Sequence, residues 1–489
     1  MIRLCVGISS LTPAWQSLFD QLGIQAEEID FSRSLSLNYS CLIINDQHNR
    51  DELKKVETFF KKDSGGILIL KPNHKLFHEL RTEATLSVEL PISFQNKVSQ
   101  YFAGSGLIYT FDFNFDFELT LNNAKRKRFP FKTGAHPDEI VSSLDRGELI
   151  STIRILVKEM HIHRRLPYVS KWHSPTKKPI FAFRVDTDFG DKSSIQSLYK
   201  LADSFQVPMT WFLHVQAHEE WLDYFHIFKN QEIALHGYEH GTSTSYEHVI
   251  NNIEKGKQLM IDAGFDPIGL CVPYSIWNDT LGDVLNTYNF NYSSEFTLGY
   301  DTLPFYPIHQ EEQHSTLQIP IHPICTGSLN RKRVSVSEME SYFETVLIQK
   351  NNQFQNVIFY HHPLQPGLEL WKNIFRKVNA LNLNKLTFSE IADFWKSRIN
   401  SIINVFYDDK LLTLTCDSSN SNLLLEVSVN SKEFYLIKAS QINQPLNMFE
   451  AFKTPKPQFV SNQTIKELNG ERLQLLKTSI LDWKNRRRL

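Results

Sequence analysis

The stretch Ile233–Gly241, IALHGYEHG, places His236 and His240 four residues apart, directly after a short apolar run. Two imidazoles at this spacing can share one metal ion when the backbone between them makes about one helical turn. They can equally be polar loop residues. The pair alone does not decide between a metal site and an ordinary loop, and the rest of the chain has to be consulted.

A pair of carboxylates ends another apolar run. The segment FRVDTDFGD carries Asp186 and Asp188, two positions apart. One carboxylate with two histidines is a common ligand set for a hydrolytic zinc ion that keeps positions open for water and substrate. The other carboxylate could then take the proton of the attacking water. Capping of the following helix would explain one acidic residue, Asp191, but not the pair at the strand end.

Seven short apolar segments must position these side chains, and helical stretches separate most of them. The pattern predicts βα units in a barrel or a strongly wound parallel sheet, where reactive side chains lie at the C-terminal strand ends. The segments are Ile180–Asp186, Met209–His214, Glu232–His236, Ile268–Tyr274, Phe290–Phe296, Leu317–His322 and Asn356–His362. Polar side chains at or beside these ends are Asp186, His214, His236, Tyr274, Glu295, His322 and His362.

The motif order is Asp-x-Asp, His-x-x-x-His, a Pro-Tyr turn and a strand that ends in His-Pro. This order resembles the polysaccharide deacetylases with a NodB-homology domain, carbohydrate esterase family 4. The resemblance covers roughly residues 179–398 and implies a distorted (β/α)7 barrel-like domain. It implies hydrolysis of an N-acetyl amide on a sugar or glycan precursor, with release of acetate. Asp186 would be the general base, and Asp188, His236 and His240 would bind a divalent metal, with Zn²⁺ expected.

The same resemblance assigns two further roles. The backbone N–H at Tyr274 would polarise the acyl carbonyl. A histidine of FYHHP would protonate the leaving amine. Adjacent strand residues point to opposite faces, so only one of His361 and His362 can face the site, and the position before Pro363 favours His362. Relatives orient this histidine with a carboxylate, for which Glu295 and Asp301 are candidates here.

One position departs from the family pattern. Relatives usually carry an arginine two residues before the proline of the Pro-Tyr turn, and Cys271 stands there in this sequence. Arg184 lies two residues before Asp186 on a strand, points to the same face and could supply the missing guanidinium. A purely structural role for Arg184 is the alternative. His214 and His322 could line the pocket or be satisfied loop histidines.

The flanks predict two further domains. Residues 1–165 are predicted to form a small α/β domain of unknown role, with strands at Ile2–Ile8, Cys41–Asn45 and Gly66–Leu70. A helix is expected near residues 50–62, a half-exposed antiparallel strand in the alternating stretch Thr110–Leu121, and a helix near Pro137–His163. The polar segment Val169–Pro179 marks the boundary to a catalytic domain at 166–400. Residues 401–489 are predicted to form a small β domain of three or four strands, closed by a short helix at 471–485.

Composition limits the partners and the compartment. A formal net charge of −2 argues against a nucleic-acid surface over the whole molecule. The basic runs at Lys125–Arg128 and at the C-terminus are predicted to be solvated. Five scattered cysteines without CxxC indicate a reducing compartment. No apolar stretch reaches the roughly 20 residues of a membrane span. We therefore expect a cytoplasmic protein with a carbohydrate partner; its oligomeric state is open.

Two alternatives to the deacetylase interpretation remain. The same clan includes enzymes that open cyclic amides, which would keep the metal site in a smaller, closed pocket. A non-catalytic glycan-binding protein with a decayed site is the other alternative, and Cys271 favours it. The retention of Asp186 argues against decay, because a binding module has no need of a general base. A structure can separate these cases by the shape and completeness of the site.

Overall fold

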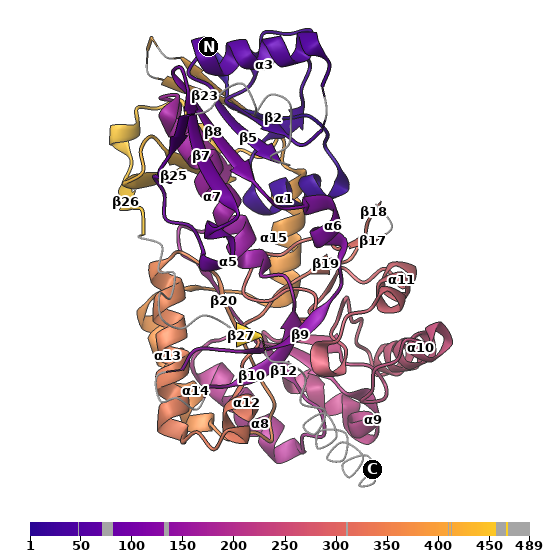
Figure 1. The fold of residues 1–489 in the computed structure, drawn as a ribbon. Coiled ribbons are helices and arrows are strands. Elements are labelled where there is room, and N and C mark those ends of the chain that lie inside the picture. Colours follow the sequence, from indigo (N-terminus) through magenta and orange to yellow (C-terminus); the bar gives the residue numbers. More distant parts are fainter. Residues whose placement is uncertain are drawn as a thin grey trace.

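The computed structural model describes residues 1–46, 48–70, 82–131, 136–309, 312–408, 410–411, 413–455 and 466–467. An α/β region from the first part of the chain lies at one end, and the barrel-like part lies at the other (Figure 1). Strands from the last part of the chain lie beside the first region. The whole is a mixed α/β protein. No helix among these residues is long and apolar enough to cross a membrane.

A curled parallel sheet forms the centre of the barrel-like part, in the order β19-β16-β15-β14-β13-β12-β20. The short strand β21 pairs with the first residues of β12. After β19 the chain returns to β20, where the His322 N–H donates to the Ile358 carbonyl at 2.9 Å. The seven predicted segments all contribute a strand, and the predicted fold class is confirmed. The strands are β12 (Ile180–Asp186), β13 (Thr210–Leu213), β14 (Glu232–Leu235), β15 (Gly269–Leu270), β16 (Tyr292–Ser293), β19 (Leu317–Gln318), β20 (Val357–His361) and β21 (Asn384–Lys385).

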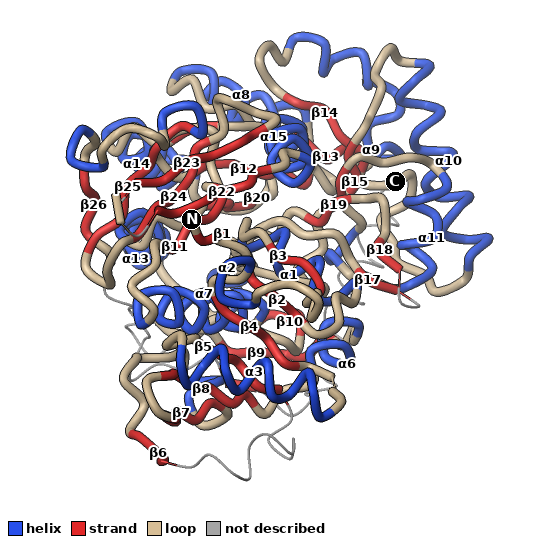
Figure 2. The backbone as a smooth tube through the Cα atoms, turned by 90° about the horizontal axis from the view of Figure 1, so that it is seen from above, coloured by secondary structure: helices blue, strands red, loops and turns tan. Residues whose placement is uncertain are grey.

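Helices cover the outside of this sheet, with α10 and α11 along the edge beside β14 and β15 (Figure 2). Local signals set their ends. The Asp191 side chain accepts from Ser194 N and caps α8, and Ser335 forms a capping box with Glu338 at α13. The helices are α8 (Lys192–Ser204), α9 (Val215–His218), α10 (Tyr246–Asp262), α11 (Asp279–Thr287), α12 (Thr326–Arg331), α13 (Val336–Asn352), α14 (Leu368–Ala380) and α15 (Phe388–Asn400), with 3-10 turns η1 (Glu219–Ile227) and η2 (Pro273–Ser275).

A second sheet, in the order β3-β2-β4-β5-β8-β7-β6, forms the N-terminal region. Its central strands are parallel, and apolar side chains of α1 and α7 pack on one face while those of α2 and α3 pack on the other. The strands are β2 (Val6–Ile8), β3 (Ala26–Glu28), β4 (Cys41–Ile44), β5 (Gly66–Leu70), β6 (Thr82–Ala84), β7 (Val98–Ala103) and β8 (Gly106–Phe111). The helices are α1 (Pro13–Leu22), α2 (Leu35–Asn38), α3 (Arg50–Lys62), α5 (Ile92–Gln95), α6 (Phe115–Thr120) and α7 (Arg146–His163).

Three local predictions in this region were wrong. The alternating stretch Thr110–Leu121 is not one strand, because β8 ends at Phe111 and Asn114 caps α6 by accepting from Phe117 N. The helix predicted near Pro137–His163 begins only at Arg146, since β10 (Asp138–Ser142) precedes it. The basic run Lys125–Arg128 lies in β9 (Ala124–Arg128), which pairs with β10. Its Lys127 is buried, with Nζ 2.8 Å from the Ser143 carbonyl, so the run is not simply solvated.

Besides the sheet that contains β9 and β10, two small antiparallel sheets of the described residues join distant parts of the chain. One has the order β1-β22-β23, and the other has the order β11-β24-β25-β26. The predicted first strand Ile2–Ile8 is therefore split between two sheets, and the predicted boundary Val169–Pro179 contributes β11. The strands are β1 (Ile2–Arg3), β11 (Tyr168–Lys171), β22 (Ile403–Asp408), β23 (Thr413–Ser418), β24 (Leu424–Ser428), β25 (Glu433–Lys438) and β26 (Ala451–Lys453). The remaining elements are β17 (Ile308–His309), β18 (Glu312–Gln313), β27 (Lys466–Glu467), η3 (Ala439–Gln441) and η4 (Leu446–Met448).

The buried Arg398 of α15 ties these parts together. Its guanidinium donates to the carbonyl oxygens of Asp20 and Gln21 at the end of α1, at 2.6 and 3.2 Å. It also donates to the carbonyls of Lys171 and Trp172, both at 2.9 Å. The three-domain division at residues 165 and 400 stays a prediction. The predicted terminal helix at 471–485 lies outside the described residues.

Candidate active site

Asp188, His236 and His240 converge at the C-terminal ends of β12 and β14. One ligand atom from each residue lies within 4.8 Å of the others. His236 Nε2 is 3.3 Å and His240 Nε2 is 3.2 Å from the same atom, Asp188 Oδ1. Asp188 adopts a left-handed φ of 44°, a conformation that costs energy for a residue with a Cβ and is often found at functional sites.

The protonation pattern of His236 suits a cation at this point. Its Nδ1 is 2.6 Å from the Cys271 carbonyl oxygen, which can only accept, so Nδ1 carries a proton. In the neutral ring, Nε2 then presents a lone pair to the Asp188 carboxylate. Two acceptors facing each other repel unless a proton or a metal ion lies between them. Carboxylate and imidazole donors with an outer hydrogen bond on the imidazole are the usual surroundings of zinc.

Asp186 lies beside this cluster and is held by Arg184. The guanidinium forms a two-pronged pair with the carboxylate, Nε to Oδ1 at 2.6 Å and Nη2 to Oδ2 at 2.7 Å. Arg184 also donates to the Ser294 carbonyl at 2.6 Å and to Ser275 Oγ at 2.8 Å. Burial by itself would raise the pKa of Asp186, but Arg184 and His236 lower it below its usual value. The contact expected between Arg184 and Asp186 is therefore present.

Cys271 does not take over the charge of the arginine that relatives carry. Burial raises the pKa of its thiol well above the usual range, so the side chain is neutral. Cys271 and His236 also form a second possible ligand group with Asp186. The Asp186 carboxylate is engaged by Arg184 on both oxygens and the thiol is protonated. The group built on Asp188 is therefore the better set of metal ligands.

His362 faces the carboxylates and His361 does not. His362 Nε2 lies 3.8 Å from Asp186 Oδ2 and 3.6 Å from Asp188 Oδ2. His361 points to the other side of β20, where its ring packs against Trp371. Burial would lower the pKa of His362, but Asp188, the Cys325 thiol and Asp186 together raise it to about 10.

Neither carboxylate candidate accompanies His362. Glu295 accepts from Gln318 at 3.0 Å and from the Val272 N–H at 3.2 Å. Asp301 accepts from His322 at 2.8 Å and pairs with Lys350 at 2.7 Å. Gln365 contacts the ring instead, with its Nε2 2.7 Å from His362 Nδ1. Sequence reasoning missed Gln365, although its place three residues after His362 in the same loop was visible.

The remaining candidates occupy different positions. Tyr274 adopts a left-handed φ of 62° in η2, and its ring centroid is 5.2 Å from that of His240. His214 is buried behind the cluster, where its Nδ1 is 2.9 Å from the Asp188 carbonyl oxygen and so supports that loop. His322 has hydrogen-bond partners away from the site for both ring nitrogens, since its Nε2 lies 3.0 Å from Tyr342 Oη in addition to the contact with Asp301.

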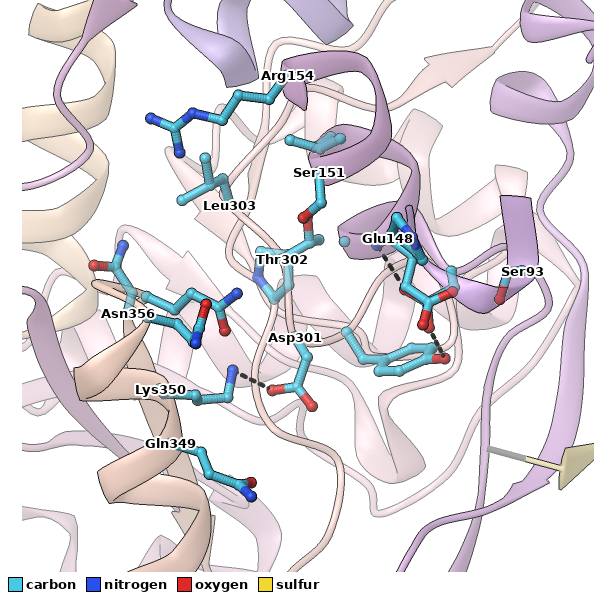
Figure 3. A pocket seen from close by; sticks show the side chains of 18 of the residues that line it. Ser93, Glu148, Ser151, Arg154, Asp301, Thr302, Leu303, Gln349, Lys350 and Asn356 are labelled. Atoms are coloured by element: carbon cyan, nitrogen blue, oxygen red, sulfur yellow. Dashed lines mark hydrogen bonds and ion pairs between the residues drawn. The ribbon is translucent and has the colours of Figure 1, made fainter. Parts of the chain in front are cut away.

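A cavity of about 1460 Å³ lies elsewhere, between α7, α13 and the loop at residues 301–303 (Figure 3). Its charged groups include Lys350, which pairs with Asp301, and Arg154, which pairs with Glu426. Asp186, Asp188, His236, His240 and His362 do not line it. The candidate site instead opens to solvent through Asp188 and His362, whose side chains are 27% and 19% exposed.

No family model and no curated protein matches the sequence. Solved structures do match. The parallel half-barrel resembles structures of CE4 polysaccharide deacetylases. One, classed as a polysaccharide deacetylase from Mycobacterium smegmatis, is 17% identical, with 47% of this chain and 94% of that chain covered and a TM-score of 0.41.

Two other matches differ in activity. A CE4 family pseudoenzyme from Bacillus anthracis is 14% identical, with 45% of this chain and 67% of that chain covered and a TM-score of 0.34. The Puue allantoinase is 13% identical, with 46% and 93% covered and a TM-score of 0.38. Likenesses at this level concern the fold of about half the chain. The chemistry has to come from the site itself.

Proposed function

We propose that this protein catalyses metal-dependent hydrolysis of an N-acetyl amide group on a sugar or glycan precursor and releases acetate. One observation carries the proposal. Asp188, His236 and His240 each place a ligand atom within 4.8 Å of the other two. The ionised Asp186 lies beside them and accepts two hydrogen bonds from Arg184. A binding module would not need this second, buried carboxylate.

Asp188, His236 and His240 would hold the divalent ion, with Zn²⁺ the expected one. Such an ion, when bound, would lower the pKa of its water to about 7 and would polarise a carbonyl oxygen. Asp186 would accept the proton of the attacking water, and Arg184 would keep the Asp186 carboxylate ionised and fixed in direction. His362 would donate its Nε2 proton to the leaving amine nitrogen as the C–N bond breaks.

Tyr274 would contribute its backbone N–H to the oxygen that becomes negative when water adds to the carbonyl. Tyr274 and Ser275 both adopt a left-handed φ, which costs energy for residues with a Cβ. Such conformations cluster at functional sites, and this supports the role given to the Tyr274 N–H. The choice of an N-acetyl sugar comes from the motif resemblance. The partial exposure of Asp188 and His362 is consistent with access for a bulky substrate.

Acetate release from a panel of N-acetylated sugars, oligosaccharides and lipid- or nucleotide-linked precursors tests the proposal. We expect release from at least one class, its loss with a chelator and its return with Zn²⁺. The Asp186→Asn protein is the matched control and should release little. Ring opening of a cyclic amide without acetate release would support the amidohydrolase alternative, and no turnover of any substrate by the metal-loaded protein would support a decayed site.

A further inference from the structure

We propose that the cavity between α7 and α13 binds an uncharged, hydroxyl-rich ligand, a stretch of carbohydrate chain, at a site separate from the candidate active site. Its volume is about 1460 Å³. Pockets for small molecules usually hold about 300–1000 Å³, so this space suits an extended ligand rather than one small molecule. The chemistry of the cavity does not depend on the proposed function. Only the choice of an N-acetylated sugar as the probe rests on it.

The two long walls of the cavity are polar faces of helices. In α7, Glu148, Ser151 and Arg154 follow one another at three-residue steps and therefore share one face. In α13, Thr345 and Gln349 do the same at a four-residue step. Helices that pack directly on each other meet through apolar side chains. These two helices instead present carboxylate, hydroxyl and amide groups to the space between them (Figure 3).

Two oxygen atoms of the lining are shut off from solvent and have no hydrogen-bond partner among the described residues. They are Oε2 of Glu148, on α7, and Oγ1 of Thr302, in the loop at residues 301–303. Buried polar atoms in folded proteins nearly always have a partner. A hydroxyl group suits both atoms, because it donates one hydrogen bond, as the carboxylate requires, and also accepts. The lining therefore favours a ligand that carries hydroxyl groups.

The charges of the lining favour an uncharged ligand. Lys350 Nζ lies 2.7 Å from Asp301 Oδ1, and Arg154 pairs with Glu426. An ionic ligand would have to compete with these pairs, whereas sugar hydroxyls can add hydrogen bonds to them without breaking them. Burial, together with a neighbouring carboxylate, raises the pKa of Glu148 above its usual value. This end of the cavity therefore does not attract a further anion.

Apolar surface lies between these polar groups. The half-buried side chains of Ile92, Ile155 and Leu303 line the same space. A pyranose ring has C–H faces as well as hydroxyl edges, so it can contact apolar and polar parts of the lining at once. A hydrated ion has no such apolar face. The combination of hydroxyl partners, matched charges and apolar patches is therefore the reason for choosing carbohydrate.

The first test is calorimetric titration of the metal-loaded full chain with a neutral oligosaccharide of N-acetylglucosamine, in the Asp186→Asn background to prevent turnover. We expect one molecule in the cavity in addition to one at the active site. Ser151→Phe, which fills the cavity with a ring, should abolish only the cavity event. The control Ser197→Phe, on the exposed side of α8, should keep both. Binding that Ser151→Phe does not change, or no binding of the sugar, overturns the inference.

A second variant makes the test independent of packing around α7. Gln349→Ala removes one hydrogen-bonding group and should weaken the cavity event roughly twofold to tenfold, whereas Gln258→Ala, on the exposed side of α10, should not. An unchanged affinity in folded Gln349→Ala contradicts the inference.

A charged sugar tests the choice of ligand class. An oligosaccharide of galacturonic acid should bind the cavity more weakly than the neutral sugar. Tighter binding of the charged sugar, lost as the salt concentration rises, would overturn the choice of an uncharged ligand. Cavity binding without acetate release by the wild type would refute the proposed function and leave this inference standing. Acetate release without cavity binding would do the reverse.

Discussion

Replacing Arg184 by methionine removes the only partner that engages both oxygens of Asp186 among the described contacts. An arginine beside a carboxylate typically lowers its pKa by about 1–3 units. Its loss therefore raises the pKa of Asp186. Since the general base must be ionised, the acidic limb of the pH dependence of kcat/KM should move upward. Breaking one side of a buried pair also costs about 3–5 kcal/mol of stability.

The assay is the pH profile of acetate release by Arg184→Met, with circular dichroism to confirm that the protein is folded at each pH. The variant Arg184→Lys keeps the positive charge but cannot form the two-pronged contact with Asp186, so the acidic limb of its pH profile should move less. Cys271→Ser, which changes a neutral neighbour of Ser275, should leave the limb in place. An unmoved acidic limb in folded Arg184→Met would refute the role given to Arg184 and strengthen the case for a decayed site.

The remaining predictions concern the base and the stability of the fold. Asp186→Asn should keep its metal and lose about 10²–10⁴-fold in kcat, measured together with metal content; loss of the metal would make Asp186 a ligand instead. Arg398→Met should lower Tm, because four backbone carbonyls lose their donor, at about 1–3 kcal/mol for each group left buried and unpaired. The exposed Arg376→Met is its control, and equal Tm values for the two would contradict the tie between α1, β11 and α15.

The barrel and the candidate site were predictable because both depend on short-range patterns. Buried parallel strands are apolar throughout, and their polar ends mark the edge where a site forms. Arg184 and Asp186 share a face because a strand repeats every two residues, and the same rule separates His361 from His362.

Most of the features that the sequence did not predict depend on contacts between residues far apart in the chain, which no local pattern indicates. Gln365 is positioned by the Gly327 N–H, 38 residues earlier in the chain. The strand β1 separates from β2 because it pairs with β22, some 400 residues away in sequence. The phenylalanine alternation after Thr110 looked like a strand, but Asn114 starts a helix there, and the exposed Phe117 shows that the alternation did not follow a buried face.

The most direct measurement of the central claim is the stoichiometry of Zn²⁺ in the purified, loaded and dialysed protein. The wild type and Asp186→Asn should each retain one ion per chain, because Asp186 is engaged by Arg184 and is not a ligand. His236→Ala and His240→Ala should retain almost none, since each removes one of only three protein ligands. Retention of a full equivalent by either histidine variant would contradict the assignment of Asp188, His236 and His240 as the metal site.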